Sequence, residues 1–286
     1  MLATVNNFYL PSNTDSNYFP STTKDKVAAN MKAIRLVKEL EENNESASPS
    51  EQETLSKYVG WGGLANEFFA EYNLKFKAER EELKTLVTTS EYEALKSSAL
   101  TAYYTDPMIA REMWNKIVDY GFTGGNVLDP SAGTGIFFMT MPEELRTTTT
   151  LYATELDSIT GAILTQLFPQ AHVLVQGFEK TPFKPVFDLI ITNVPFGDIR
   201  IIDKDYEKPY LIHDYFLKKS VDLLEENGLV TIITSIGTVD KDNSILPEIQ
   251  SKADFLGGIR LPSNAFKRIA GTDVTSDILM FQRKEN

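Results

Sequence analysis

Short apolar runs alternate with helical patterns from about residue 101 to the end of this 286-residue chain. Strands are expected near Asn126–Asp129, Leu151–Glu155, His172–Gln176, Phe187–Thr192, Val230–Thr234, Phe255–Arg260 and Asp277–Gln282. Helices are expected between them, near Pro107–Tyr120, Ile136–Met139, Ser158–Leu167 and Asp214–Glu226. Such alternation is typical of a mostly parallel sheet covered by helices. Residues 101–286 are therefore predicted to form one α/β domain with a seven-stranded sheet.

The first hundred residues follow a different pattern and are predicted to form a small helical region, residues 1–100. Residues 1–22 are rich in Asn, Ser, Thr and Pro, which predicts an extended or loosely ordered arm. Helices are then expected over Thr23–Asn43, from a capping box at Ser48–Glu51 to about Tyr58, near Glu67–Glu71, over Lys77–Thr85, and from a cap at Thr89 or Ser90. Trp61, in the glycine-dense turn between them, is expected to plug the core rather than to stack on a base.

Composition narrows the possible chemistry. The chain has no cysteine, which excludes disulfides, cysteine-based zinc sites and a thiol nucleophile. Two histidines and no carboxylate cluster at ligand spacing predict no metal site. Neither a signal peptide nor an apolar run of the roughly 20 residues that span a bilayer is visible, so we expect a soluble cytoplasmic protein with no membrane contact. The net charge of −12 is unfavourable for a nucleic-acid enzyme, because phosphate contacts come from Lys and Arg.

A glycine loop, Asp129-Pro-Ser-Ala-Gly-Thr-Gly135, lies between an expected strand and an expected helix. Its glycines let the backbone approach a ligand, and the helix that follows favours an anionic group. Glu155 ends the next strand at the distance usual for an acid that hydrogen-bonds ribose hydroxyls. A dinucleotide fingerprint requires a third glycine where this chain has Phe138. The loop therefore favours S-adenosylmethionine over NAD.

The apolar strand Phe187–Thr192 ends abruptly in Asn193-Val194-Pro195-Phe196, at the edge where ligands bind in open α/β sheets. The Asn193 side-chain oxygen and the Val194 carbonyl form a pair of acceptors suited to the amino hydrogens of adenine N6, and would turn its lone pair toward a sulfonium methyl group. Phe196 would stack on the base, which must first leave the duplex. The alternative without chemistry is a strand-to-turn transition capped by Asn193.

Taken in order, these motifs resemble the gamma-class N6-adenine DNA methyltransferases. The resemblance rests on Tyr103–Pro107, Asp129–Gly135, Glu155, Gln176–Glu179 and Asn193–Phe196. Tyr58–Leu64 and Arg260–Phe266 look more specifically like the methylase part of helicase–methylase polypeptides from conjugative elements and phages. The similarity covers roughly residues 23–284. It implies the Rossmann-like class I fold of S-adenosylmethionine-dependent methyltransferases and a double-stranded DNA substrate.

The resemblance also implies roles for single residues. Tyr104, Thr105, Asp129, Gly133 and Gly135 would contact the methionine part of the cofactor, Glu155 would hold its ribose, and Gln176 and Phe178 would flank its adenine. Ala132 and Leu156 would complete the cofactor site, and Phe266 would be a second aromatic wall for the flipped base. His213 either lines the substrate pocket or is a partly exposed residue beside Asp214, which would cap the start of its helix.

Two departures from that class shape the interpretation. Val194 stands where proline is usual, which keeps the carbonyl but not the fixed φ of proline. Enzymes of that class usually carry a target-recognition domain after the sheet, whereas these 286 residues end just after the last expected strand. A separate recognition subunit or a downstream helicase-like region is therefore an expected partner. Two alternatives stay open. One is methylation of a protein glutamine, which the acidic charge favours; the other is a non-catalytic module of the same fold that docks a partner or counters a host defence.

Overall fold

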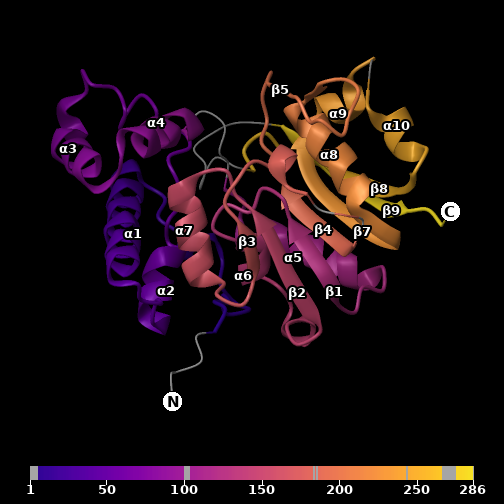
Figure 1. Cartoon of the computed structure of the whole chain (residues 1–286), viewed down its shortest axis with the longest axis horizontal. Coiled ribbons are helices and arrows are strands. Elements are labelled where there is room, and N and C mark those ends of the chain that lie inside the picture. Colours follow the sequence, from indigo (N-terminus) through magenta and orange to yellow (C-terminus); the bar gives the residue numbers. More distant parts are fainter. Residues whose placement is uncertain are drawn as a thin grey trace.

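The computed structural model describes residues 6–99, 104–182, 184, 186–242, 244–265 and 275–285. Within them a seven-stranded sheet, in the order β3-β2-β1-β4-β7-β9-β8, forms the centre of the molecule (Figure 1). The strands are β1 (Gly125–Asp129), β2 (Thr149–Thr154), β3 (His172–Leu174), β4 (Phe187–Asn193), β7 (Leu224–Ser235), β8 (Ala253–Leu261) and β9 (Ser276–Arg283). Every expected strand is present, and the predicted sheet is confirmed.

All strand pairs from β3 to β7 are parallel, and β9 runs antiparallel to both β7 and β8. The central strands β1 and β4 are covered on both faces, which explains their near-continuous apolar runs. Val127 of β1 pairs with Leu189 of β4, so the two strands stay in step to their carboxyl ends. Asp129 and Asn193 therefore emerge at the same edge of the sheet.

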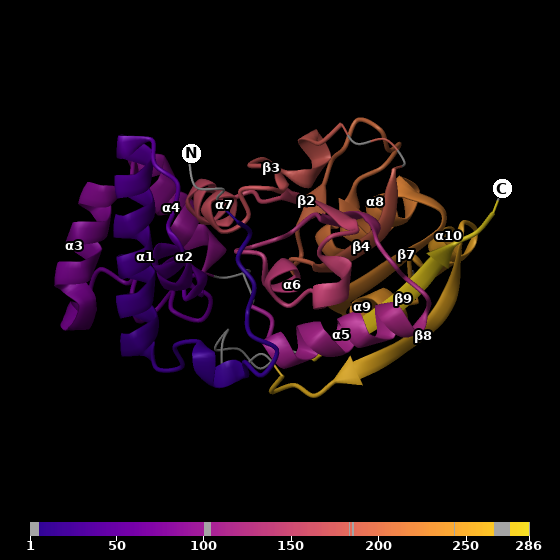
Figure 2. The ribbon, with the colours of Figure 1, turned by 90° about the horizontal axis from the view of Figure 1, so that it is seen from below.

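Helices cover the two faces of the sheet (Figure 2). One face carries α5 (Pro107–Asp119), α6 (Ile136–Met139) and α7 (Ser158–Leu167), and the other carries α8 (Ile212–Leu223) and α10 (Leu246–Gln250). The helix expected over Asp214–Glu226 ends earlier, because Leu224–Glu226 already belong to β7. The remaining elements are α9 (Gly237–Asp240), the two-stranded pair β5 (Arg200–Ile201) and β6 (Tyr210–Leu211), and the 3-10 helices η3 (Glu143–Leu145) and η4 (Phe178–Lys180).

The N-terminal region contributes α1 (Thr23–Asn43), α2 (Pro49–Ser56), η2 (Leu74–Phe76), α3 (Lys77–Leu86) and α4 (Thr89–Ser98), with α1 and α2 against α7 (Figure 1). The predicted capping box is confirmed, since the Ser48 backbone N–H donates to Glu51 Oε2 at 2.7 Å. The cap of α4, however, is Thr88. The domain boundary near residue 100 stays a prediction, because residues 100–103 lie outside the described residues.

The helix expected near Glu67–Glu71 is wrong. This stretch forms turns, in which Phe68 and Phe69 face inward and pack on Trp61 with ring centroids 4.3 and 5.4 Å away. In this conformation Trp61, Phe68 and Phe69 are all buried in one aromatic cluster. Trp61 itself is fully buried, as expected for a core plug.

The arm is extended but not loosely ordered over its described part, which begins at residue 6 and includes η1 (Ser16–Tyr18). Its backbone crosses the helices of the first face: the N–H of Phe8 donates to the Leu167 carbonyl and that of Leu10 to the Met139 carbonyl, each at 2.8 Å. These bonds satisfy carbonyls near the ends of α7 and α6, which is why a polar, Pro-containing segment is held in place. Among the described helices, none has the length and apolar composition that crossing a membrane requires.

Candidate active site

A cavity of about 620 Å³ opens where the central parallel strands end. Its volume lies in the range of about 300–1,000 Å³ that is usual for small-molecule sites. Most of the predicted site residues line it: Tyr104, Thr105, Asp129, Ala132, Gly133, Glu155, Leu156, Gln176, Phe178, Asn193, Val194 and Pro195. Gly135, Phe196 and His213 are not among the lining residues, and Phe266 lies outside the described residues.

Asp129 forms the floor of the cavity at the end of β1, with 1% of its surface exposed. Its Oδ1 accepts hydrogen bonds from the Ser131 N–H at 3.1 Å and from the Thr192 hydroxyl at 2.7 Å. Its Oδ2 has no hydrogen-bond partner among the described residues. Burial raises the pKa of Asp129 to about 7. One oxygen is thus fixed by the protein, and the other is an acceptor for a ligand that enters the cavity.

The two glycines of the loop have different surroundings. Gly133 has a φ of +57° and open space where a Cβ would stand, so it lets a ligand approach the backbone. Gly135 has a φ of +90°, and a Cβ there would lie 2.6 Å from the ring of Phe168. Gly135 therefore allows the loop to pack against the end of α7, and the structure does not bring it to the cavity wall as the resemblance implied.

Glu155 follows β2 and is half-buried in the cavity wall. Its Oε2 accepts the Gly133 N–H at 2.8 Å, and its Oε1 accepts the Asp157 N–H at 3.0 Å. Enclosure by the cavity walls, with Asp157 nearby, raises the pKa of this carboxyl group to about 7. The carboxylate therefore joins the glycine loop to the end of β2 and faces the space where a ribose would lie.

Asn193 is the last residue of β4, and its side-chain Nδ2 donates to the Thr105 hydroxyl at 3.0 Å. Thr105 is buried just before α5, so it fixes the plane of the Asn193 amide. The next residue, Val194, is anchored by a hydrogen bond from its N–H to the Ile233 carbonyl of β7 at 3.1 Å. Thr105 thus orients Asn193 and also lines the cavity, and its expected contact with the cofactor stays a prediction.

Phe178 and Gln176 form the wall beyond β3. Phe178 is buried, and its ring packs on Phe216 with centroids 5.2 Å apart. Gln176 donates from Nε2 to the Lys180 carbonyl at 3.2 Å, which closes the turn around η4. Leu156 lies at the rim with 75% of its surface exposed, where it can cover a bound ligand.

The N-terminal region supplies a wall that sequence reasoning missed: Tyr58, Gly60, Ala94, Ser97 and Ser98. Gly60 has a φ of +66°, and a Cβ there would lie 3.0 Å from the ring of Tyr104. The glycine thus lets the turn after α2 close over the cavity. The glycine-dense segment Val59–Leu64 was the available signal, because glycines at a close approach often mark a site.

Both alternatives for His213 are wrong. It does not line the cavity, and it is buried rather than partly exposed. It lies in α8 with 4% of its surface exposed, and burial, helped by the charge of Lys241, lowers its pKa to about 4. Its Nε2 lies 3.8 Å from Asp214 Oδ1. Asp214 does not cap the helix either, since α8 begins at Ile212 with Leu211 in the cap position. The imidazole is therefore neutral at physiological pH.

Phe196 is also buried, with 8% of its surface exposed, and lies outside the cavity lining. The described residues contain no group of His, Cys, Asp and Glu side chains arranged to hold a metal ion. The charge of the cavity is one-sided. Among the lining residues in the described part of the chain, the charged ones are all acidic: Asp129, Glu155, Asp157 and Glu179. Such a lining favours a cationic ligand and disfavours a phosphate.

No model of a known protein family matches the chain. The chain is 34% identical to Defense against restriction protein B of Escherichia phage P1 over 194 residues, which are 65% of this chain and 8% of that protein. The chain therefore spans only a small part of this relative.

Solved structures show the fold. A type I restriction-modification methyltransferase subunit from Streptococcus thermophilus superposes with a TM-score of 0.56 at 14% identity, covering 90% of this chain and 66% of that chain. A putative class I S-adenosylmethionine-dependent methyltransferase from Listeria monocytogenes superposes with a TM-score of 0.54 at 15% identity, covering 90% of this chain and 88% of that chain. The modification subunit of a putative type I restriction enzyme from Vibrio vulnificus superposes with a TM-score of 0.54 at 20% identity, covering 72% of this chain and 50% of that chain. The predicted class I methyltransferase fold, with its N-terminal helical region, is confirmed.

Proposed function

We propose that this chain is an S-adenosylmethionine-dependent methyltransferase that acts on N6 of adenine in DNA. One observation carries the proposal. Asn193, Glu155 and Gly133 line a single cavity of about 620 Å³, and every charged residue of its described lining is acidic. This combination supports a cationic cofactor beside a group that binds an exocyclic amine.

The charge of the lining supports the choice of cofactor. S-adenosylmethionine supplies a methyl group activated by a positively charged sulfur and carries an ammonium group, whereas NAD carries a pyrophosphate. Asp129 presents an unpaired Oδ2 at the cavity floor, and Glu155 presents a carboxylate where ribose hydroxyls would bind. In their ionised form both groups accept hydrogen bonds, attract a cation and repel a phosphate.

The arrangement around Asn193 supports amino-group methylation. Thr105 fixes the Asn193 amide, and the Ile233 carbonyl fixes Val194, so two neighbouring acceptors can be held still before the substrate arrives. Acceptors on both N6 hydrogens would turn the nitrogen lone pair toward the methyl group and stabilise the positive charge that N6 gains. The N6 proton would then leave to solvent. No residue needs to act as a general base.

Two experiments test this proposal. Calorimetric titration should show saturable binding of S-adenosylmethionine and none of NAD; the reverse result would contradict the cofactor assignment. Transfer of a labelled methyl group should then be measured in parallel to DNA, RNA and protein. Label in DNA is the expected outcome. Label in a protein glutamine would show that the substrate is protein and not DNA, because the same pair of acceptors can bind a carboxamide.

DNA would also need contacts that the cavity does not supply, since the described lining has no Lys or Arg. We infer that phosphate contacts and sequence recognition come from another part of the surface, from a recognition subunit, or from a further region such as a helicase-like one. The measurement is DNA affinity of the chain alone and with candidate recognition partners. Tight, sequence-specific binding by the chain alone would assign these contacts to its own surface outside the cavity, and binding that appears only with a partner would assign them to the partner.

A second role is favoured by the name of the phage relative, Defense against restriction protein B. N6 of adenine faces the major groove, where a restriction enzyme reads it, so methylation there would itself protect DNA. A non-catalytic protein of the same fold would instead protect by docking. An Asn193→Ala variant separates these mechanisms, because only the docking mechanism survives loss of methyl transfer.

A further inference from the structure

The ribbon formed by β5 and β6 stands at the rim of the cavity, directly after Asn193–Phe196. Arg200 of β5 pairs with Leu211 of β6, and the Ile212 N–H donates to the Ile199 carbonyl at 2.8 Å. Ile199 and Ile201 line the cavity. Figure 1 shows β5 rising beyond the carboxyl ends of the strands. The ribbon therefore forms part of the cavity rim, next to the segment Asn193–Phe196.

The ribbon exposes a large apolar side chain at this rim. Ile202 is 80% exposed and follows the cavity residue Ile201 directly. The basic residues Arg200 and Lys204 are exposed on either side of it. An exposed isoleucine is unremarkable by itself. Ile202 differs from other exposed apolar residues because the segment that carries it is attached to the body of the protein by two sets of contacts.

The inner attachment is a buried ion pair. Lys219 of α8 donates to Asp203 Oδ2 at 2.8 Å and to the Phe178 carbonyl at 2.9 Å. The Tyr215 hydroxyl donates to the same Asp203 oxygen at 2.6 Å. Asp203 is the residue after Ile202, so the backbone beside the exposed side chain is fixed to α8 and to the cavity wall at Phe178.

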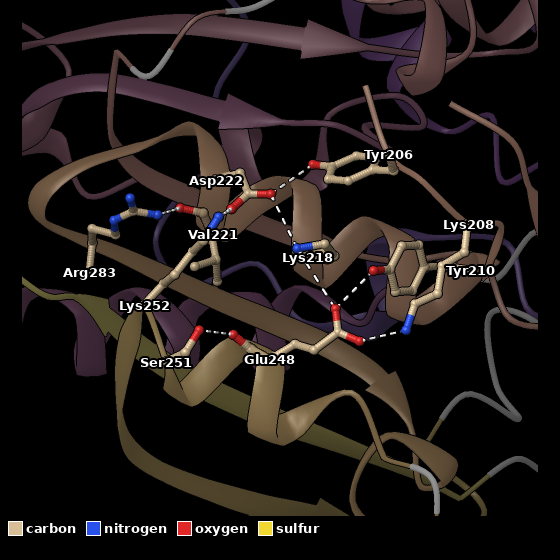
Figure 3. A network of polar contacts seen from close by, with 10 residues as sticks. All are labelled: Tyr206, Lys208, Tyr210, Lys218, Val221, Asp222, Glu248, Ser251, Lys252 and Arg283. Atoms are coloured by element: carbon tan, nitrogen blue, oxygen red, sulfur yellow. Dashed lines mark hydrogen bonds and ion pairs between the residues drawn. The ribbon is translucent and has the colours of Figure 1, made fainter. Parts of the chain in front are cut away.

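The outer attachment is the polar network in Figure 3. Tyr206 donates its hydroxyl hydrogen to Asp222 at 2.9 Å, and Tyr210 donates to Glu248 at 2.8 Å. Lys218 lies between these two acids, 3.6 Å from Asp222 and 3.9 Å from Glu248. The return half of the ribbon is thereby tied to α8 and α10. These contacts hold the backbone on the carboxyl side of Ile202 against the body of the protein.

We propose that Ile202 is a wedge that enters the base stack of duplex DNA and fills the space left when the target adenine turns into the cavity. The proposal rests on the proposed DNA methylation. Proteins that deform DNA insert apolar side chains, isoleucine among them, between base steps and partially unstack them. Such a side chain must be held against the force of the base stack. Here that resistance comes from Asp203–Lys219 on one side and from the Tyr206 and Tyr210 contacts on the other.

The experiment compares the rates of methyl transfer to duplex and to single-stranded DNA of the same sequence. Ile202→Ser should slow transfer to the duplex by roughly tenfold or more and leave single-stranded transfer within about twofold, because a single-stranded base needs no unstacking. Ile202→Phe should keep duplex activity. The matched control is Leu74→Ser, a similarly exposed residue (74%) of η2 in the N-terminal region, which should change neither rate.

The outcomes separate this proposal from the proposed function. If Ile202→Ser methylated duplex DNA as fast as the wild type does, and single-stranded DNA as well, the wedge would be overturned and DNA methylation would stand. Equal loss on both substrates would also overturn it, because that pattern indicates damage to the cavity. A folded wild-type protein that binds S-adenosylmethionine but methylates neither DNA form, even when the candidate recognition partners are present, would overturn the proposed function, and the wedge with it.

Discussion

Gly133 donates its backbone N–H to Oε2 of Glu155 across 2.8 Å, which joins the glycine loop after β1 to the end of β2. The second oxygen of Glu155 accepts the Asp157 N–H. Both oxygens of the carboxylate are thus already used, and a ribose that binds here must share these contacts. Ligand binding at Glu155 is therefore coupled to the position of the glycine loop.

Glu155→Ala should weaken binding of S-adenosylmethionine. A hydrogen bond to a charged group contributes about 1.5–3 kcal/mol, so we expect the dissociation constant to rise by roughly ten- to hundredfold. Calorimetry measures this directly. The control is Glu225→Ala on an exposed part of β7, which should bind as the wild type does. Unchanged affinity in a folded Glu155→Ala variant would remove Glu155 from the cofactor site.

The stability of the ligand-free protein should depend on pH through the cavity floor. The pKa of Asp129 is about 7, raised by burial above its ordinary value of 3.8, so the folded state holds a proton that the unfolded state has lost between these pH values. The contribution of Asp129 to the melting temperature should therefore fall as pH rises from about 4 to about 7. Affinity for the cationic cofactor should rise as Asp129 loses its proton near pH 7.

Thermal melting at intervals of pH tests this, with Asp129→Asn as the comparison. The variant removes the titrating group and keeps a similar shape, so its melting temperature should change less across the window. A variant whose melting temperature changes with pH in the same way as that of the wild type would show that Asp129 does not titrate as its burial implies.

Asn193→Ala should lose methyl transfer and keep the cofactor. Loss of one preorganised acceptor typically costs about 100- to 1,000-fold in rate. Thr105→Val should have a smaller effect in the same direction, because it removes the hydroxyl that holds the Asn193 amide at 3.0 Å. Single-turnover transfer and calorimetry together measure both properties. A parallel loss of cofactor binding in Asn193→Ala would mean that the residue shapes the cofactor site instead.

Gly60→Ala tests the wall built by the N-terminal region. A left-handed φ of +66° costs an alanine roughly 1–2 kcal/mol, and its Cβ would also lie 3.0 Å from Tyr104. Gly121→Ala is the matched control, with a φ of +90° and nothing within 4 Å of the added Cβ. Both variants should be destabilised in urea, but only Gly60→Ala should bind S-adenosylmethionine more weakly. Equal binding by the two would exclude this wall from the site.

Sequence patterns predicted the sheet well because its signals are local. A buried strand such as Leu189–Ile191 is apolar throughout, and the loop and Asn193 follow their strands directly. The helix expected near Glu67–Glu71 failed for the opposite reason. Its residues are compatible with a helix, and the contact that decides against it, Trp61 with Phe68, arises only on packing.

The same distinction applies to the cavity. Asp129 and Glu155 were visible because parallel strands bring their carboxyl ends together. The wall at Gly60 and the ion pair of Lys219 with Asp203 were not, since each joins segments whose approach no periodicity encodes. His213 shows the limit of reading one residue at a time: its burial in α8 comes from elements that pack on it later in the chain.

The most direct test of the central claim is the chemical identity of the methylated product. Duplex DNA would be incubated with wild-type protein and S-adenosylmethionine, digested to nucleosides and analysed by mass spectrometry, beside Asn193→Ala. The account predicts that the wild-type reaction yields N6-methyl-2′-deoxyadenosine and that the variant yields only background levels of it. A methyl group on another base or on protein, or equal N6 methylation by the variant, would contradict it.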